Sequence, residues 1–282
     1  MNPKTPGTSK AHKEKSAPPR TYHRTTKVHR PRAQTPSPPG VSTTVSGVRP
    51  SNEDAAALDT LAEIYPYEPA AVIAGLSPQR LGPYLAQVGG DPDEALLLYV
   101  YNARIAGALL EELGYAEVVL RNALVAQLEI IAARAYPGVP WYECDRMLDD
   151  WECNDILRAR NAILDRAEAL SGGKIIAELG FGFWTHLISS DRSWIWHNGL
   201  PRAFPCFLGA AYHQTEIHGT AVRLCELRNR IAHHEPLLEH NIAADHAQII
   251  NLVGWVSRDA RNWVEASGRA LALSFPKQRR KI

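Results

Sequence analysis

The chain has 282 residues and a formal net charge of +1, a length that suits one large domain or two small ones. Its four cysteines form no Cys-x-x-Cys pair, which argues against a zinc ribbon and a disulfide scaffold and favours reduced thiols. The N-terminus lacks the apolar core of a signal peptide, and no uncharged apolar run approaches about 18 residues. We therefore expect a cytoplasmic protein with no membrane partner.

Residues 1–52 differ in composition from the rest of the chain. They hold ten Lys or Arg residues against one acidic residue, together with nine of the 20 prolines, and they contain no Leu, Ile, Phe or Trp. Such a segment cannot bury enough apolar surface to offset its ordering entropy, so we predict a disordered basic tail. The remaining residues hold 21 basic and 29 acidic side chains. The tail therefore either binds an anionic partner or keeps the protein soluble.

Residues 53–90 form a predicted helical appendage in which we identify no chemistry. Residues 55–64 have the spacing of a short amphipathic helix. The pair Ser77-Pro78 is typical of a helix start, with Ser as the cap and Pro at the first helical position. The pair Gly89-Gly90 is expected to end the helix that begins there.

Residues 91–275 are predicted to form an all-α domain, because no stretch alternates like a strand and no hairpin signal separates two such stretches. Asp91 followed by Pro92 indicates a helix start, and helical spacing continues to Leu113. Gly114 is expected to cap or kink this helix before a second one. The further predictions are helices over 115–136, 147–170, about 214 to 235 and 240–267, and an apolar core segment over 174–188.

The stretch CELRNRIAHHEP, residues 225–236, concentrates groups that bind anions and transfer protons near neutral pH. At about 100° per residue, its helix has an apolar stripe, and Arg228 falls on the same side. The apolar stripe consists of Leu224, Leu227 and Ile231. The polar stripe consists of Glu226, Asn229, Arg230 and His233. Because an unpaired buried guanidinium is costly, Arg228 is expected to face a carboxylate on a neighbouring helix or a lined cavity.

Arg228-Asn229, followed after three residues by His233, resembles the Arg-to-His signature of the HEPN ribonucleases. The string from Leu227 to Pro236 is similar to the abortive-infection (Abi-like) branch of that superfamily. Two further stretches resemble the same branch, namely residues 95–128 and the segment GKIIAELGFGFW (173–184) with the tryptophans that follow it. The resemblance spans roughly residues 76–260 and implies a HEPN-like helical bundle.

The resemblance also implies a metal-independent endoribonuclease of the abortive-infection or toxin type. In that chemistry a base takes the proton of a ribose 2′-hydroxyl, which attacks the adjacent phosphorus, and an acid protonates the leaving 5′-oxygen. Arg228 would stabilise charge on the phosphoryl oxygens, Asn229 would hold the imidazole or a phosphate oxygen, and His233 would transfer the proton. The implied partners are single-stranded RNA, a second copy of the chain and an antitoxin protein.

The assignment of the residues around this motif has alternatives. His234 competes with His233 as the catalytic imidazole. Glu117 and Arg121 are either a solvated i,i+4 ion pair or, as the resemblance implies, groups that line the site and orient Arg228. The full set of supporting residues is His234, Glu117, Arg121, Asn122, Glu226 and Arg230.

Two other functions compete with the ribonuclease. The first is a metal site at the two histidines. Adjacent histidines project about 100° apart on a helix, and no His-Glu-x-x-His or cysteine partner is present, so neither a metal nor a cofactor is expected there. The second is a catalytically inactive helical dimer that acts as an RNA- or protein-binding module in phage defence.

Overall fold

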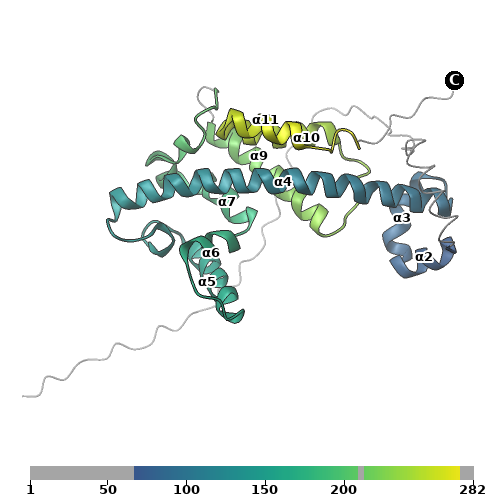
Figure 1. The fold of residues 1–282 in the computed structure, drawn as a ribbon, viewed down its shortest axis with the longest axis horizontal. Helices are drawn as coiled ribbons and strands as arrows, with labels where there is room; N and C mark the ends of the chain where they lie inside the picture. Colours follow the sequence, from purple (N-terminus) through teal and green to yellow (C-terminus); the bar gives the residue numbers. More distant parts are fainter. Residues whose placement is uncertain (1–66, 209–212, 274–282) are drawn as a thin grey trace, which may run out of the picture. The chain divides into compact units, whose positions relative to one another are not determined.

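A computed structural model describes residues 67–208 and 213–273 (Figure 1). Within these two ranges the chain forms helices and no strand, so the all-α prediction is confirmed. Among the described helices, none has both the length and the apolar character needed to cross a membrane. The predicted basic tail and the predicted helix over 55–64 lie outside the described residues.

The described part begins with two short helices, α2 (Pro69–Leu76) and α3 (Pro78–Gln87). As predicted, Ser77 caps α3, its hydroxyl accepting a hydrogen bond from the Arg80 backbone N–H at 3.3 Å, and Pro78 is the first helical residue. Two fully buried side chains of α3, Leu81 and Tyr84, form a small apolar cluster with residues of the next helix and with Leu238. This cluster fixes α3 to a segment of the chain that lies more than 100 residues later.

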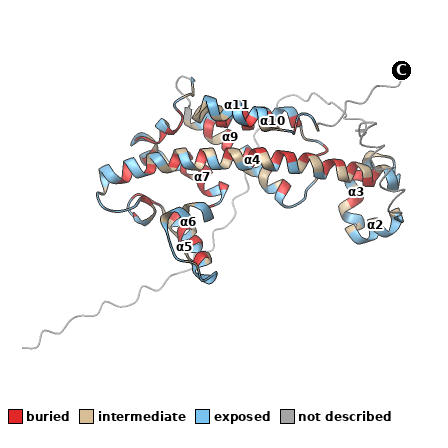
Figure 2. Cartoon of the chain, viewed as in Figure 1, coloured by how far each residue is buried: buried red, intermediate tan, exposed pale blue. Residues whose placement is uncertain are grey.

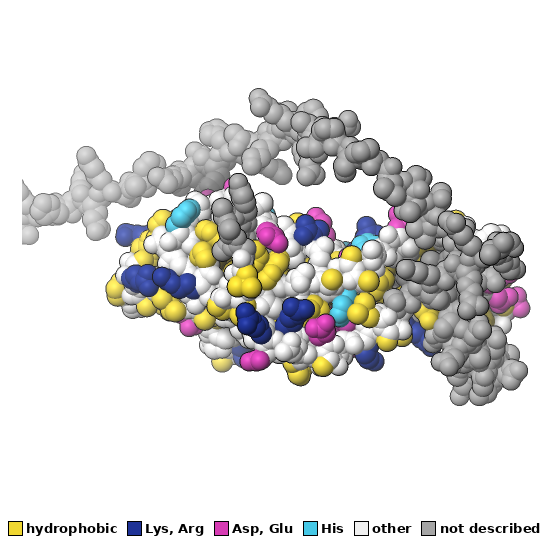
Figure 3. Space-filling view, turned by 90° about the horizontal axis from the view of Figure 1, so that it is seen from above, with side chains coloured by type: hydrophobic (Ala, Val, Ile, Leu, Met, Phe, Trp, Pro, Cys, Tyr) yellow, Lys and Arg dark blue, Asp and Glu magenta, His cyan; other side chains and the backbone are white. Residues whose placement is uncertain are grey.

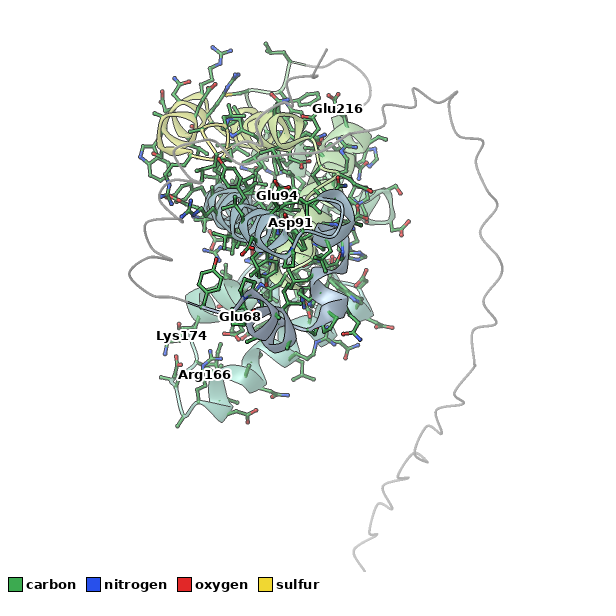
Figure 4. The ribbon with its side chains drawn as sticks, turned by 90° about the vertical axis from the view of Figure 1, so that its right-hand side faces the viewer. Glu68, Asp91, Glu94, Arg166, Lys174 and Glu216 are labelled. Carbon is green, nitrogen blue, oxygen red and sulfur yellow. The ribbon has the colours of Figure 1, made fainter. Side chains whose placement is uncertain are left out.

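The longest helix is α4 (Pro92–Ala135), whose 44 residues span about 66 Å at 1.5 Å each. Asp91 caps it as predicted, because its Oδ1 accepts hydrogen bonds from the backbone N–H groups of Asp93 and Glu94, each at 3.0 Å (Figure 4). Helices α2, α3, α7, α9, α10 and α11 all contact α4.

The prediction that Gly114 ends or kinks this helix is wrong, because α4 continues through it without a break. A glycine inside a helix costs about 1 kcal/mol relative to alanine. Buried leucines on both sides of Gly114, including Leu113 and Leu120, pack into the main core and offset that cost. Figure 2 shows buried residues recurring along the whole of α4.

The middle of the chain is built from short helices. They are η1 (Trp141–Glu143), α5 (Asp150–Asp165), α6 (Gly172–Glu178), α7 (Phe181–Leu187), η2 (Ser190–Arg192), α8 (Ser193–His197) and η3 (Leu200–Ala203). The predicted core segment is confirmed, since Phe181, Phe183 and Trp184 are each at most 1% exposed. Ion pairs of Arg166 with Glu178 and of Lys174 with Glu168 close the turn between α5 and α6 (Figure 4).

The last three helices are α9 (His213–Ala232), α10 (Ile242–Val256) and α11 (Arg258–Ser267). A single helix over 240–267 was expected, but Ser257 is extended, with φ −153° and ψ 127°, and separates α10 from α11. Its hydroxyl accepts a hydrogen bond from the Ala260 backbone N–H at 3.2 Å, so this serine caps a new helix. Apolar side chains of α9, α10 and α11 enter the same core as α4.

Candidate functional site

The motif residues lie where α9 ends. His233 and His234 follow the last helical residue, Ala232, and both are exposed. The His234 backbone N–H donates to Ile231 O at 2.9 Å and the Glu235 N–H donates to Arg230 O at 3.0 Å. This pair of bonds, with φ +56° at His234, is the Schellman arrangement in which glycine is usual at the left-handed position. His233 and His234 therefore do not project as neighbours on one helix, which corrects the geometry expected from the sequence.

Two side chains from distant helices hold this turn in place. Arg80 of α3 donates from one terminal nitrogen to His234 O at 2.5 Å and to His233 O at 3.4 Å. Asn102 of α4, which is 5% exposed, accepts a hydrogen bond from the Leu237 backbone N–H at 2.7 Å. A cation at a helix C-terminus satisfies free carbonyl groups and opposes the negative end of the helix dipole. The backbone that carries His233 is thus held from both sides.

Asn229 and His233 line one open groove of about 520 Å³. The other lining residues are Arg223, Glu226, Leu227, Arg230, Glu235, His240 and Asp245. Arg230 is paired with Glu235 at 3.2 Å, and His240 with Asp245 at 3.0 Å. The groove therefore brings an exposed imidazole, a carboxamide and two guanidinium groups to one surface.

Arg223 differs from Arg230, the other arginine in the groove, in the neutralisation of its charge. In the described part of the chain, its hydrogen bonds go to the neutral oxygens Gln248 Oε1, at 2.8 Å, and Thr220 Oγ1, at 3.1 Å. No carboxylate neutralises it there, so its charge remains able to attract an anion. Arg223 was not among the residues predicted from the sequence, although it lies one helical turn before Leu227 and at the same groove.

Arg228 is half-buried and does not line the groove. Its Nη1 donates to Asn229 Oδ1 at 3.1 Å, so Asn229 connects it to the groove wall. Burial raises the pKa of the Glu117 carboxyl on α4, and the positive charges of Arg228 and Arg121 oppose that rise. Within the described ranges, neither arginine forms an ion pair with Glu117, and Arg121 Nε is buried without a partner. Of the two alternatives for Glu117 and Arg121, the solvated ion pair is therefore not formed.

Comparisons with known proteins give this chain no relative, since no family model, no curated protein and no solved structure matches it.

The structure brings together part of the set of residues selected from the sequence. Glu226, Asn229, Arg230 and His233 share the groove, while Arg228 faces Glu117 and Arg121 beside it. His234 is exposed at the turn but is not a groove residue, and Asn122 is exposed on α4. The Arg80 contact was missed because it joins residues 153 and 154 positions apart, a separation at which no local pattern operates.

The described residues carry an acidic excess, with 17 Lys or Arg against 25 Asp or Glu. On the face shown in Figure 3, basic and acidic side chains of this part alternate, without an extended field of either sign. A polyanion would therefore be attracted by local groups such as Arg223 or by segments outside the described residues.

Proposed function

We propose that this protein is a metal-independent endoribonuclease of the abortive-infection or toxin type, acting on single-stranded RNA in the cytoplasm. The observation that supports this most directly is that the exposed His233 ring and Asn229 line one open groove, with Arg228 bonded to Asn229. This is the juxtaposition of proton-transfer and phosphate-binding groups that cleavage by a 2′-hydroxyl requires.

The reaction begins when a base removes the proton of a 2′-hydroxyl, which attacks the adjacent phosphorus. The 5′-oxygen then leaves and takes a proton from an acid, so that a 2′,3′-cyclic phosphate forms. His233 transfers one of these protons, because an imidazole changes charge near neutral pH. Arg223, on the groove wall, stabilises the charge that gathers on the phosphoryl oxygens, and Arg228 adds its positive charge from behind Asn229, to which it donates.

One motif supplies one His233, whereas the reaction uses both a base and an acid. A second copy of the chain that faces the first would supply the other imidazole, so the active form is a homodimer in this proposal. An antitoxin protein that covers the groove, and a role in phage defence, belong to the same proposal and rest on the family resemblance alone.

The test is cleavage of a mixed single-stranded RNA pool by the purified full chain in EDTA. Wild type should cut and leave 2′,3′-cyclic or 3′-phosphate ends, and 2′-deoxy substitution at the cleavage position should block the cut. His233→Ala should remove activity while the helical circular-dichroism signal is kept. The matched control is His197→Ala on α8, an exposed histidine of the short helices, which should cut normally.

A fully active His233→Ala variant, or cleavage that EDTA abolishes, would contradict this function.

The second candidate is a binding module without catalysis, and one surface favours it. Along α4, five small or apolar residues lie on one exposed face: Ala103, Gly107, Leu110, Gly114 and Val118. Exposed apolar stripes mark contacts with other macromolecules. If this candidate is right, Leu110→Glu will abolish self-association or RNA binding in light scattering and filter binding, whereas His233→Ala will have no effect.

A further inference from the structure

A second cluster of titratable side chains lies away from the α9 groove, between α5 and α7. Asp149 caps α5 and Glu152 lies in its first turn, while His186 lies at the end of α7 and Arg192 ends η2. His186 Nε2 is 2.8 Å from Asp149 Oδ2 and 3.9 Å from Glu152 Oε1. Arg192 Nη2 is 2.8 Å from the other oxygen of Glu152, Oε2.

In each of the two carboxylates, one oxygen caps the helix and the other lies near His186. Asp149 Oδ1 accepts from the Glu152 backbone N–H at 2.8 Å, and Glu152 Oε2 accepts from the Asp149 backbone N–H at 2.9 Å. These two bonds form a capping box, which explains one oxygen of each residue. The remaining oxygens, Asp149 Oδ2 and Glu152 Oε1, both lie near His186 Nε2. Helix capping does not account for them.

Glu152 has a buried carboxylate oxygen that forms no hydrogen bond within the described residues. Its side chain is 0% exposed, and Oε1 is buried without a hydrogen-bond partner in the described part of the chain. Burial raises the pKa of this carboxyl, against which the hydrogen bond from the Asp149 backbone and the charge of Arg192 act. A buried carboxylate oxygen without a donor is costly unless a cation or a proton satisfies it.

We propose that Asp149 Oδ2, Glu152 Oε1 and His186 Nε2 bind one Zn²⁺ ion that links α5 to α7. All three atoms lie within 4.8 Å of one another. Tetrahedral ligands about 2.0–2.2 Å from zinc lie roughly 3.4 Å apart, between the 2.8 and 3.9 Å separations found here. Asp149 and His186 are 33% and 27% exposed, so a water can complete the coordination from the solvent side.

The ligand set favours a transition-metal ion such as Zn²⁺ over Ca²⁺ and Mg²⁺. One imidazole with two carboxylates suits Zn²⁺, whereas Ca²⁺ and Mg²⁺ are bound mainly by oxygen ligands. With a neutral imidazole, the two carboxylates and Arg192 leave the cluster with a charge of −1, which a divalent cation reverses. Arg192 Nη2 bonds Glu152 Oε2 and donates to Met147 O at 2.7 Å, two atoms that the ion does not use. Its Nη1 lies 3.6 Å from the ligand atom Asp149 Oδ2, where it would be an outer partner of that carboxylate.

This site is independent of the ribonuclease proposal, because none of its residues lines the α9 groove. Its effect would be to join two helices that are separated in sequence, since Asp149 and His186 are 37 residues apart. A metal in this position stabilises the fold, by an amount set by its concentration and affinity.

The experiment uses the full chain, stripped with a chelator and then dialysed. Zn²⁺ is titrated by calorimetry, and Co²⁺ is added as a spectroscopic substitute whose visible absorption reports four-coordinate geometry. We expect one equivalent to bind, and zinc to raise the melting temperature. Glu152→Gln and His186→Gln should each weaken binding by at least the roughly 10- to 100-fold that the loss of an outer partner costs. His197→Gln, an exposed histidine outside the cluster, is the matched control and should bind as wild type does.

Equal Zn²⁺ affinity in wild type, Glu152→Gln and His186→Gln would overturn the proposal, as would the failure of wild type to bind. Glutamine keeps the shape of Glu152, and circular dichroism identifies a variant that does not fold. In that event Asp149→Asn replaces it, because asparagine caps a helix as well as aspartate does. Loss of Co²⁺ absorption in Asp149→Asn, with its helical signal retained, would then support the site, and retained absorption would refute it.

Discussion

The end of α9 and the α5–α7 cluster each gather histidine, arginine and carboxylate side chains, but they do so in opposite environments. At the end of α9, Asn229 and His233 lie on the wall of an open groove, and both histidines of the motif are exposed. In the α5–α7 cluster, Glu152 is 0% exposed and Arg192 is 12% exposed. The first region keeps its polar groups available to a ligand in solution, whereas the second uses most of them to bond one another.

The two environments predict that mutations will affect different properties in the two regions. Exposed polar groups in a groove stay hydrated and contribute little to the free energy of unfolding. Substitutions there should therefore change activity and leave stability nearly constant. Buried charges depend on each other, so the removal of one leaves an uncompensated partner. The expected effects of mutation therefore separate the two regions.

Glu152→Ala should have the largest effect. It removes the closer of the two carboxylates beside the nearly buried Arg192 guanidinium, leaving only Asp149 at 3.6 Å, and it removes half of the capping box, so the free energy of unfolding should fall by about 3–5 kcal/mol. Urea unfolding in EDTA measures this, with Glu129→Ala on the exposed face of α4 as the control. A change of less than about 1 kcal/mol would mean that Asp149 alone compensates the Arg192 charge.

Arg228→Lys should come next, and it should affect activity. Lysine keeps the charge but loses the planar fork that donates to Asn229 Oδ1, so RNA cleavage should fall by roughly 100-fold or more. The free energy of unfolding should stay within about 1 kcal/mol of wild type, because Arg228 is only half-buried. Unchanged kcat/KM in this variant would remove Arg228 from the site.

Arg80→Ala should have a smaller effect on both properties. It removes the donor to His233 O and His234 O, which should cost about 0.5–1.5 kcal/mol and loosen the turn. We expect faster hydrogen exchange of the amides at 233–235 and a drop in cleavage of about tenfold, with Arg80→Lys in between. Exchange rates equal to those of wild type would show that Asn102 alone holds the turn.

Glu117→Gln should have the smallest effect, and its sign depends on pH. The folded pKa of Glu117 is raised, so its favourable contribution to stability is complete below the unfolded value of about 4.3 and is lost as the pH rises through the folded value. The uncharged amide removes that loss. Relative to wild type, the variant should therefore gain stability between pH 4 and pH 7, measured as the shift in the urea midpoint. A relative loss over this range would reverse the assignment.

Asp149 should behave in the opposite way. Although burial opposes it, hydrogen bonds from the Glu152 backbone and His186 lower the pKa of this carboxyl. Its contribution is present above the unfolded pKa and is lost as the pH falls through the lowered folded value. In Asp149→Asn, the free energy of unfolding should therefore fall less than in wild type as the pH is lowered.

Local signals were sufficient for much of the fold. The caps at Ser77 and Asp91 and the buried segment around Phe183 depend on a few adjacent residues, and all three were predicted correctly. The helix expected to run up to Pro236 ends earlier, at Ala232. The predictions at Gly114 and Ser257 were wrong in opposite directions. A break was predicted at Gly114, where burial of the flanking leucines keeps the helix continuous. A continuous helix was predicted through Ser257, whose side chain instead caps a new helix. Whether a glycine interrupts a helix depends on packing that the local pattern does not contain.

In the candidate sites too, only the features formed by residues close together in the sequence could be predicted. The contiguous motif was visible in the sequence because its groups lie within a few residues of one another. The Arg80 contact and the α5–α7 cluster were not visible, because their members are assembled by packing over 37 to 154 positions. The only local sign of the second cluster was the Asp-x-x-Glu spacing of Asp149 and Glu152, which is also typical of an ordinary helix start.

The unbroken course of α4 has a mechanical consequence. The helix carries Leu98, which packs against α3, and Glu117, which feels the charge of Arg228, on one continuous axis. Each residue added to a helix turns everything beyond it by about 100°. The number of α4 residues between the α3 contact and the Arg228 contact therefore fixes the angle between these two contacts around the helix axis. In this way α4 sets the orientation of α3, which carries Arg80, relative to α9, which carries Arg228.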